Sequence, residues 1–306
     1  MFSFGSDPEV FIAKNGKIVN AIDLLPNKEN KISRGFTSIY YDNVLAEMQI
    51  SPAETASECV HNFRKAFQIL QEIIKDHEIK IESAHWFDDE DLLLKDSRVV
   101  GCNSEFCAYT LDQINPPQEI IQNTGFRTAG GHIHLGGNDL FDDSKGILNT
   151  VRMLDLFVGI PSILLDNDTT QKYRRKIYGH AGSHRIPDHG LEYRCLGNFW
   201  LKSPRLVELI FDLTEHTINF IENDGHKLFW ATDEEYDDSI DQTTFCFGYD
   251  ANLLQKCINN CDQRKAEKFM HIVNCHLPKD LAYKIEDFSE TNFNFYNEWG
   301  LDCLDS

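Results

Sequence analysis

The chain has 306 residues, of which 42% are hydrophobic and 25% charged, the balance of a soluble globular protein. Its formal net charge of −20 argues against non-specific binding to nucleic acid or anionic membranes, because an acidic surface repels phosphate groups. No segment approaches the roughly 20 uninterrupted apolar residues that we expect of a membrane-spanning helix. The start, MFSFGSDPEV, lacks the basic flank and apolar stretch of a secretory signal. We therefore expect a cytoplasmic location and reduced cysteines.

The first part of the chain is predicted to be β-structure followed by a long helix. Residues 8–13 form a predicted strand, and an Asn-Gly turn leads into a returning strand over 17–22. Residues 44–50 alternate apolar and polar side chains, which is typical of a half-buried strand, and this strand ends at Pro52. Apolar residues at spacings of three and four predict a helix over 53–75, with Ser51-Pro52 as its start signal.

The rest of the chain continues with strands and helices in runs. We expect strands over 99–110, 126–137 and 190–200, helices over 144–166 and 208–223, and a polar, helical part from residue 233 to the aromatic segment 292–299. Because regular strand–helix alternation is missing, the pattern favours an α+β fold with a mostly antiparallel sheet and packed helices. No linker or repeat marks a boundary, so we expect one domain over 1–306 whose part 201–306 is helix-rich.

Two acidic pairs in the first strands are candidate metal ligands. Asp7 and Glu9 are two residues apart on a predicted strand, so both side chains face the same side. Glu47 and Gln49 repeat this spacing, with Asp42 just upstream. Adjacent carboxylates repel each other unless a cation lies between them, and oxygen ligands suit Mg²⁺ or Mn²⁺. The alternative is the solvated polar face of ordinary strands.

A glycine-framed histidine pair forms the segment GGHIHLGG. His132 and His134 lie on one face of a predicted strand, and glycines at both ends let a ligand or another backbone come close. Two imidazoles on one strand face are a common arrangement for binding metal or phosphate. A lone buried histidine is usually part of the core, but this pair is not a lone histidine.

An arginine-rich segment follows in a chain that is otherwise acidic. Arginine binds phosphate or carboxylate through a bidentate fork and keeps its charge. The alternative is a salt-bridge network with Asp188 or Glu192. No phosphate-binding glycine loop and no nucleophile motif is present, so phosphate would need metal and arginine. The four arginines are Arg174, Arg175, Arg185 and Arg194.

Read in order, five short motifs resemble the glutamine synthetase-like carboxylate–amine ligases, which include glutamate–cysteine ligase. The stretch YGHAGSHRIPDHGLEYRCLGNFW is most similar to the phage-encoded COOH–NH2 ligases of type 2. The resemblance covers roughly residues 1–200. The motifs are Asp7-Pro8-Glu9, Glu47-Met48-Gln49, Gly131-His132-Ile133-His134, Arg185-Ile186-Pro187 and Glu192-Tyr193-Arg194.

The resemblance implies a curved antiparallel catalytic domain that binds ATP and Mg²⁺ or Mn²⁺. Glu9 and Glu47, together with Asp42, would hold one metal. The second metal would bind Asp7, His132 and Glu192. Arg185 and Arg194 would neutralise the transferring phosphoryl group as catalytic residues. The nucleotide would lie against His134, Arg174, Arg175 and His180. Asp7 stands where Glu is commoner, Gln49 where a carboxylate would fit, and His180 where Lys or Arg is expected.

The implied reaction joins a small-molecule or peptide carboxylate to an amine, with ADP and phosphate released through an acyl phosphate. Two alternatives remain open from the residues alone. A metal-dependent hydrolase could also use a His-x-His strand with carboxylates, and a non-catalytic descendant could keep the fold as a binding module. The sequence names neither substrate and leaves a homo-oligomer open.

Overall fold

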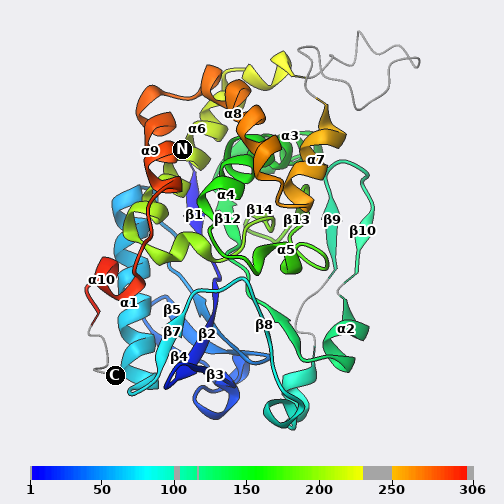
Figure 1. Cartoon of the computed structure of the whole chain (residues 1–306). Helices are drawn as coiled ribbons and strands as arrows, with labels where there is room; N and C mark the ends of the chain where they lie inside the picture. Colours follow the sequence, from blue (N-terminus) through cyan, green and yellow to red (C-terminus); the bar gives the residue numbers. More distant parts are fainter. Residues whose placement is uncertain (1, 100–103, 116, 230–249, 302–306) are drawn as a thin grey trace.

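The computed structural model describes residues 2–99, 104–115, 117–229 and 250–301. It confirms the α+β class, with curled antiparallel sheets and several helices. Most of the helices gather at one end of the molecule, and the short strand of residues 3–5 lies beside them, whereas the strands between residues 9 and 49 lie at the other end (Figure 1). One large hydrophobic core includes residues from Phe2 to Trp299. The single-domain boundary over 1–306 stays a prediction.

The central sheet brings the histidine and arginine motifs onto neighbouring strands. β12 pairs with β1 on one side and with β14 on the other, and β14 pairs with β13, all antiparallel. Its six strands, in spatial order, are β1 (Ser3–Gly5), β12 (Ile133–Gly136), β14 (Leu191–Tyr193), β13 (Ser183–Arg185), β9 (Glu105–Cys107) and β10 (Gln113–Ile114).

The N-terminal sheet carries the acidic motifs. Its strands run in the order β3 (Lys17–Val19), β2 (Glu9–Lys14), β6 (Leu45–Gln49), β5 (Thr37–Asp42) and β4 (Ile32–Arg34), and β7 (Glu78–Lys80) pairs with β2. A two-stranded sheet is made of β8 (Ala84–Trp86) and β11 (Phe126–Thr128). The predicted hairpin is confirmed, with Asn15 and Gly16 at positive φ in its turn.

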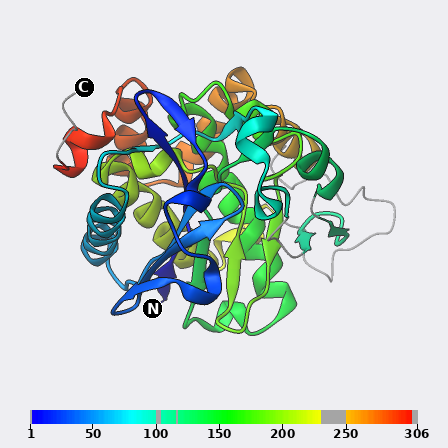
Figure 2. The same cartoon turned by 90° about the horizontal axis from the view of Figure 1, so that it is seen from below.

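Helix α1 (Ala56–Ile74) covers one face of the N-terminal sheet (Figure 2). Its buried residues Phe63 and Phe67 join the same core as Ile39 and Met48 of the sheet. The opposite face carries Glu9 and Glu47 at one end and a second, smaller hydrophobic cluster that includes Phe11 and Leu45. The predicted helix is confirmed, but it begins later than Pro52, because the Thr55 side chain caps it by accepting from the Glu58 amide.

The apolar segment Ser144–Leu165 is a continuous helix, as predicted, made of α3 (Ser144–Leu154), a π-helical turn (Asp155–Gly159) and α4 (Ile160–Leu165). By length and composition it could cross a membrane, but 78% of its most apolar window is buried inside the protein. That burial is typical of a core helix. The cytoplasmic location stays a prediction.

The remaining helices form the upper part of Figure 1 and the two flanks. Helix α6 (Pro204–Glu222) confirms the predicted helix over 208–223 and packs on α1 and α3. The helical prediction after residue 233 is confirmed for the described part, whereas 233–249 lies outside the described residues. The others are α2 (Gln118–Asn123), α5 (Gln171–Arg174), α7 (Ala251–Asn259), α8 (Gln263–His276), α9 (Lys279–Ser289) and α10 (Phe295–Trp299).

Three predicted strands are too long. The segment 126–137 divides into β11 and β12, which belong to different sheets, because residues between them bridge to Gly197 and to β2 instead. Only Leu191–Tyr193 of 190–200 is a strand, and a 3₁₀ turn occupies Phe199–Lys202. Within 99–110 the strand is Glu105–Cys107, and 100–103 lies outside the described residues.

Candidate functional site

Three carboxylates converge on the polar face of the N-terminal sheet. Glu9 of β2 lies directly opposite Glu47 of β6, and Asp42 is the last residue of β5. One oxygen from each lies within 4.8 Å of the others. We call this group the carboxylate cluster. Tyr40, opposite Glu47 on β5, donates its hydroxyl to Glu47 Oε1 at 2.5 Å, and the Gly130 amide donates to Glu9 Oε2 at 2.6 Å.

The electrostatics of the carboxylate cluster favour an added cation. Burial and then repulsion from Asp42 raise the pKa of Glu9 to about 8. Burial also raises the pKa of Asp42 and, together with repulsion from Asp7, that of Glu47 well above its ordinary value. No Lys, Arg or His of the described ranges forms an ion pair with any of the three. Like charges without a counter-ion cost free energy, which a divalent cation would recover.

A second group lies beside the first and combines Asp7, His132 and Glu192. His132 Nδ1 is 3.5 Å from Asp7 Oδ1 and 3.5 Å from Glu192 Oε1. Both His132 and Glu192 are buried, and one ligand atom of each of the three residues lies within 4.8 Å of the others. We call this group the histidine cluster. An imidazole with two carboxylates is a donor set that Mg²⁺ or Mn²⁺ accepts.

Asp7 departs from the geometry expected of it. It precedes β2 instead of lying in that strand, so Asp7 and Glu9 do not form one acidic pair. Asp7 joins the histidine cluster and Glu9 joins the carboxylate cluster. Strand alternation therefore does not determine the facing of Asp7, but the two groups match the two ligand sets that the resemblance implied.

The protonation states within the histidine cluster suit metal binding. Burial, followed by the charge of Arg194, lowers the pKa of His132 to about 3, so the imidazole is neutral and can act as a ligand. Burial and repulsion from Asp7 raise the pKa of Glu192 to about 7. Burial opposes ionisation of Asp7 as well, but the charge of His134 and hydrogen bonds from both histidines lower its pKa below the ordinary value.

Arg194 is fixed between two buried carboxylates. Its Nε donates to Glu105 Oε2 at 2.7 Å, and its Nη1 pairs with Glu192 Oε1 and lies 3.2 Å from His132 Nδ1. Only 1% of Arg194 is exposed. Arg185 lies on the adjacent strand β13, and its Nη1 is 3.6 Å from Glu192 Oε2. Both predicted catalytic arginines therefore face the histidine cluster.

His134 extends the histidine cluster toward the loop after β13. Its Nε2 is 2.9 Å from Asp7 Oδ1, and its Nδ1 is 2.9 Å from Nε2 of His189. The two imidazole rings are stacked with their centroids 5.1 Å apart. His134 thus connects the loop residue His189 with Asp7, and its place beside a nucleotide stays a prediction.

Two of the other predicted nucleotide residues, Arg174 and Arg175, lie deeper in the protein. Arg174 is 1% exposed and donates to the carbonyl oxygens of Cys195 and Arg194. Arg175 is 4% exposed and bonds the Gly179 carbonyl and the Cys195 thiol, so the structure does not bring it to either cluster. His180 is partly exposed, and burial lowers its pKa below the ordinary value.

Gly130 joins the two clusters through close packing. Its carbonyl accepts from the Glu9 amide at 2.9 Å, and its amide donates to the Glu9 carboxylate. A Cβ at this position would lie 2.4 Å from His132 Nε2. The glycine is therefore required by the approach of His132, in agreement with the reading of GGHIHLGG as a site of close contact.

Four residues that the sequence did not single out belong to the site. Tyr40 and Glu105 are buried partners of the predicted site residues Glu47 and Arg194, and the place of Glu105 inside the predicted strand 99–110 was the available signal. His189 contacts His134, and the Tyr178 ring lies 6.0 Å from the His132 ring, with Arg194 over it at 5.1 Å. Neither loop residue shows a periodic pattern in the sequence.

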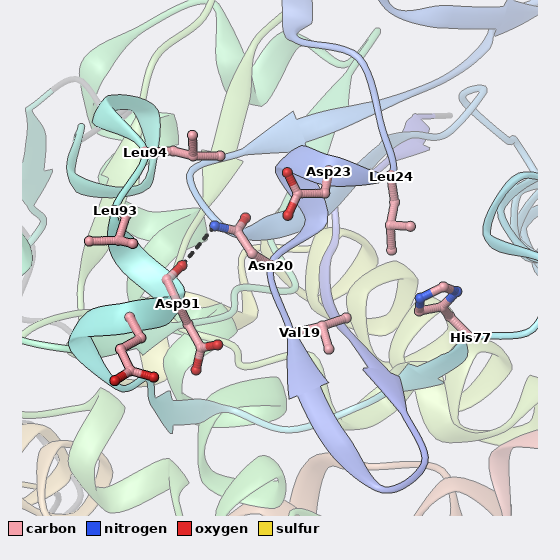
Figure 3. Close-up of a pocket in the computed structure, with 9 residues that line it drawn as sticks. Val19, Asn20, Asp23, Leu24, His77, Asp91, Leu93 and Leu94 are labelled. Atoms are coloured by element: carbon pink, nitrogen blue, oxygen red, sulfur yellow. Dashed lines mark hydrogen bonds between the residues drawn. The ribbon is translucent and has the colours of Figure 1, made fainter.

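A separate pocket of about 510 Å³ lies near the N-terminal sheet (Figure 3). In that close-up, Asn20 donates to the Asp91 carbonyl at 3.0 Å, and Leu93 and Leu94 stand on the opposite wall from His77. None of the predicted site residues lines it. Its lining residues are Val19, Asn20, Asp23, Leu24, His77, Glu90, Asp91, Leu93 and Leu94.

Comparison with known proteins identifies one family and one solved structure. The comparison with curated proteins gives no match. Among solved structures, the chain is similar to the crystal structure of a bifunctional glutathione synthetase from Pasteurella multocida, at 9% identity and a TM-score of 0.43, over 94% of this chain and 51% of that one. The chain therefore spans about half the length of that protein. Residues 121–232 match the family described as phage phiEco32-like COOH.NH2 ligase-type 2.

The matched segment contains the GHIH, RIP and EYR motifs, whereas Asp7, Glu9 and Glu47 lie outside it and reach the same site by folding. The match supports the prediction of a carboxylate–amine ligase. It confirms the resemblance drawn from the motifs: over residues 121–232, this chain is similar to the phage phiEco32-like COOH–NH2 ligases of type 2.

Proposed function

We propose that this protein is an ATP-dependent ligase that joins a carboxylate to an amine and uses divalent cations held by its two clusters. One observation carries the proposal. Three buried or half-buried carboxylates meet beside an Asp–His–Glu group, and no described cation pairs with Glu9, Asp42 or Glu47. The ligase resemblance of residues 121–232 supports the same chemistry.

The donor atoms fit Mg²⁺ or Mn²⁺. The carboxylate cluster offers only oxygen ligands, and the histidine cluster adds the neutral imidazole of His132 to the oxygens of Asp7 and Glu192. Bound divalent cations would neutralise phosphate oxygens and the reacting carboxylate. In this assignment Gln49 is not a ligand, because its side chain bonds to Lys31, and Asp42 takes part in its place.

The arginines of the chain supply fixed positive charge for the phosphoryl group. Arg194 is held by Glu105 and Glu192, so its guanidinium does not have to reorganise when charge develops. Arg185, on the adjacent strand, faces the same cluster. His134, between Asp7 and His189, lies beside the place proposed for the nucleotide. Nucleotide binding by Arg174, Arg175 and His180 stays a prediction.

The proposed reaction has two balanced steps. An oxygen of the acid attacks the γ-phosphorus of ATP, the bond between that phosphorus and the bridging oxygen breaks, and ADP leaves. The amine nitrogen then attacks the acyl carbon, phosphate leaves with its oxygen, and the nitrogen loses a proton to give the amide. The acid and the amine are small molecules or peptides in this proposal.

The test uses hydroxylamine as the amine, because it traps activated carboxylates as hydroxamates whatever the natural amine is. The protein is incubated with Mg²⁺, ATP and a panel of acids, and ADP and hydroxamate are measured. We expect both products in equal amounts, and loss of both in His132→Ala and Glu192→Ala. The exposed Glu119→Gln variant should behave like the wild type.

The outcomes separate the three candidate functions. Acid-dependent ADP and hydroxamate support the ligase. Cleavage of amides without ATP would support a metal-dependent hydrolase, and binding of ATP without turnover of any substrate would support a non-catalytic descendant. Near-normal turnover in His132→Ala or in Glu192→Ala, with folding confirmed by circular dichroism, would contradict the assignment of the site.

A further inference from the structure

The polar face of the N-terminal sheet continues beyond the carboxylate cluster. On β6, Gln49 follows Glu47 on the same face, and its partner on β5 is Ser38. Ser38 contacts Ser33 of β4 through their hydroxyl groups at 3.0 Å. Because α1 covers the other face, these side chains extend the face that carries the cluster toward the edge strand β4.

Two lysines from the segment before β4 lie over this extension. Lys28 Nζ is 5.4 Å from the centre of the Tyr40 ring, and its charge opposes the effect of burial on the pKa of Asp42. Lys31 Nζ donates to Gln49 Oε1 at 2.6 Å. Both lysines are exposed, and neither forms an ion pair with any residue that the structure describes.

Gln49, the hydrogen-bond partner of Lys31, leaves the positive charge of Lys31 available to bind an anion. Gln49 is a neutral amide at a position where the resemblance would allow a carboxylate, so Gln49 orients the ammonium group without neutralising it. An ammonium group has three donors, and the bond to Gln49 uses one of them. In a chain of net charge −20, two exposed lysines that form no salt bridge with the described residues provide a local site for an anion beside the metal-binding face.

We infer that the acid substrate carries a second anionic group, which Lys28 and Lys31 bind while its reacting carboxylate lies at the carboxylate cluster. The inference rests on the proposed ligase function. Glu47 and Gln49 are two residues apart on a strand, a spacing of roughly 6.6 Å. The two anionic groups are therefore separated by a few bonds, as in a short dicarboxylic acid. The lysines are substrate-binding residues that set specificity, not catalytic residues.

The test compares dicarboxylic acids with their monoamides in the hydroxylamine assay. Succinate is paired with succinamate, and glutarate with glutaramate, at saturating ATP and Mg²⁺. For the wild type we expect kcat/KM for each diacid to exceed that for its monoamide at least about tenfold, since ~1.4 kcal/mol of charge recognition corresponds to that ratio. In Lys28→Gln/Lys31→Gln the ratio should fall to about one, with the KM for ATP unchanged.

The matched control is Lys14→Gln, which removes an exposed lysine from the same sheet where it pairs with Asp76. This variant should keep the wild-type ratio. A second readout avoids turnover: with Mg²⁺ present, the diacid that reacts best should raise the melting temperature of the wild type and of Lys14→Gln, but not of the double variant.

The possible failures are distinguishable. Hydroxamate formation from diacids and monoamides at equal rates in the wild type would overturn this inference and leave the ligase function standing. An unchanged ratio in the double variant would also overturn it. Absence of hydroxamate with every acid would overturn the ligase function together with the inference.

Discussion

Glu9 and Glu47 are direct cross-strand partners in the antiparallel β2–β6 pair, with Asp42 at the end of the next strand. Like charges placed opposite each other on adjacent strands destabilise a sheet. The register that creates this repulsion is the one that buries Val10, Ala46 and Met48 against α1. The sheet therefore maintains a costly acidic pair, and this cost is what a bound cation would relieve.

Removing one charge of this pair should separate stability from metal binding. At pH 9, above the raised pKa of Glu9, and in the absence of divalent cations, Glu9→Gln should melt at the wild-type temperature or up to about 3 °C higher, since relief of a cross-strand repulsion is worth up to about 1 kcal/mol. The rise in melting temperature that Mn²⁺ or Mg²⁺ gives the wild type should be lost. Differential scanning calorimetry with and without the metal measures both, with Glu119→Gln as control. Equal metal-dependent shifts in Glu9→Gln would contradict the metal site.

The stability of the metal-free protein should fall between pH 6.5 and 8.5. The pKa of Glu9 is raised to about 8, so the folded state holds a proton that the unfolded state has released, and this advantage disappears as the pH rises through 8. Below pH 6.5 the lowered pKa of His132 acts in the opposite direction, which sets the lower limit of the window. Glu9 alone should account for a loss on the order of 1 kcal/mol.

Urea unfolding at several pH values in the presence of EDTA measures this slope. Glu9→Gln should show a flatter dependence than the wild type, because its amide does not titrate. Added Mg²⁺ should stabilise the wild type more at pH 8.5 than at pH 6.5, since metal and proton compete for the same carboxylates. Identical slopes in wild type and variant would show that Glu9 does not hold a proton.

Gly130 should tolerate no side chain. A Cβ there would lie 2.4 Å from His132 Nε2, so Gly130→Ala should displace the imidazole and cost about 1–3 kcal/mol of stability. Binding of Mn²⁺, followed by calorimetry, should weaken at least about tenfold, as expected when a ligand is displaced. Gly5→Ala is the control, because its Cβ would make an ordinary contact of 3.6 Å with His134 Cβ. Wild-type Mn²⁺ affinity in Gly130→Ala would disprove the close-packing argument.

Arg194 should not be replaceable by lysine. Its guanidinium bonds Glu105 and Glu192 at once, and the single ammonium group of lysine cannot reproduce that fork. Arg194→Lys should lower kcat for ATP turnover on the order of 100-fold or more. Arg205→Lys, whose Arg205 pairs with Glu298 at a half-exposed site, should change kcat less than about twofold. Comparable kcat values in the two variants would remove Arg194 from the phosphoryl site.

Much of the fold could be read from periodicity. The hairpin of β2 and β3, strand β6 and helices α1, α3–α4 and α6 follow from apolar spacing, because each buries one face. Strand lengths could not be read in the same way. The apolar run 126–137 divides because Gly130 bonds Glu9 and Gly197 instead of continuing one ladder, and those partners are far away in the sequence.

The sequence by itself determined the candidate residue types for the site and the short spacings that the acidic, histidine and arginine motifs share. Only the tertiary structure decided which further residues hold them in place. Glu105 fixes Arg194, Tyr40 bonds Glu47, the Gln49 side chain bonds Lys31, and Arg175 bonds the Gly179 carbonyl and the Cys195 thiol away from both clusters. The reason is physical. Alternation along a strand determines which face of the sheet each side chain points to. The residues that surround a side chain are set by strand order and register, which depend on pairing between segments far apart in the sequence.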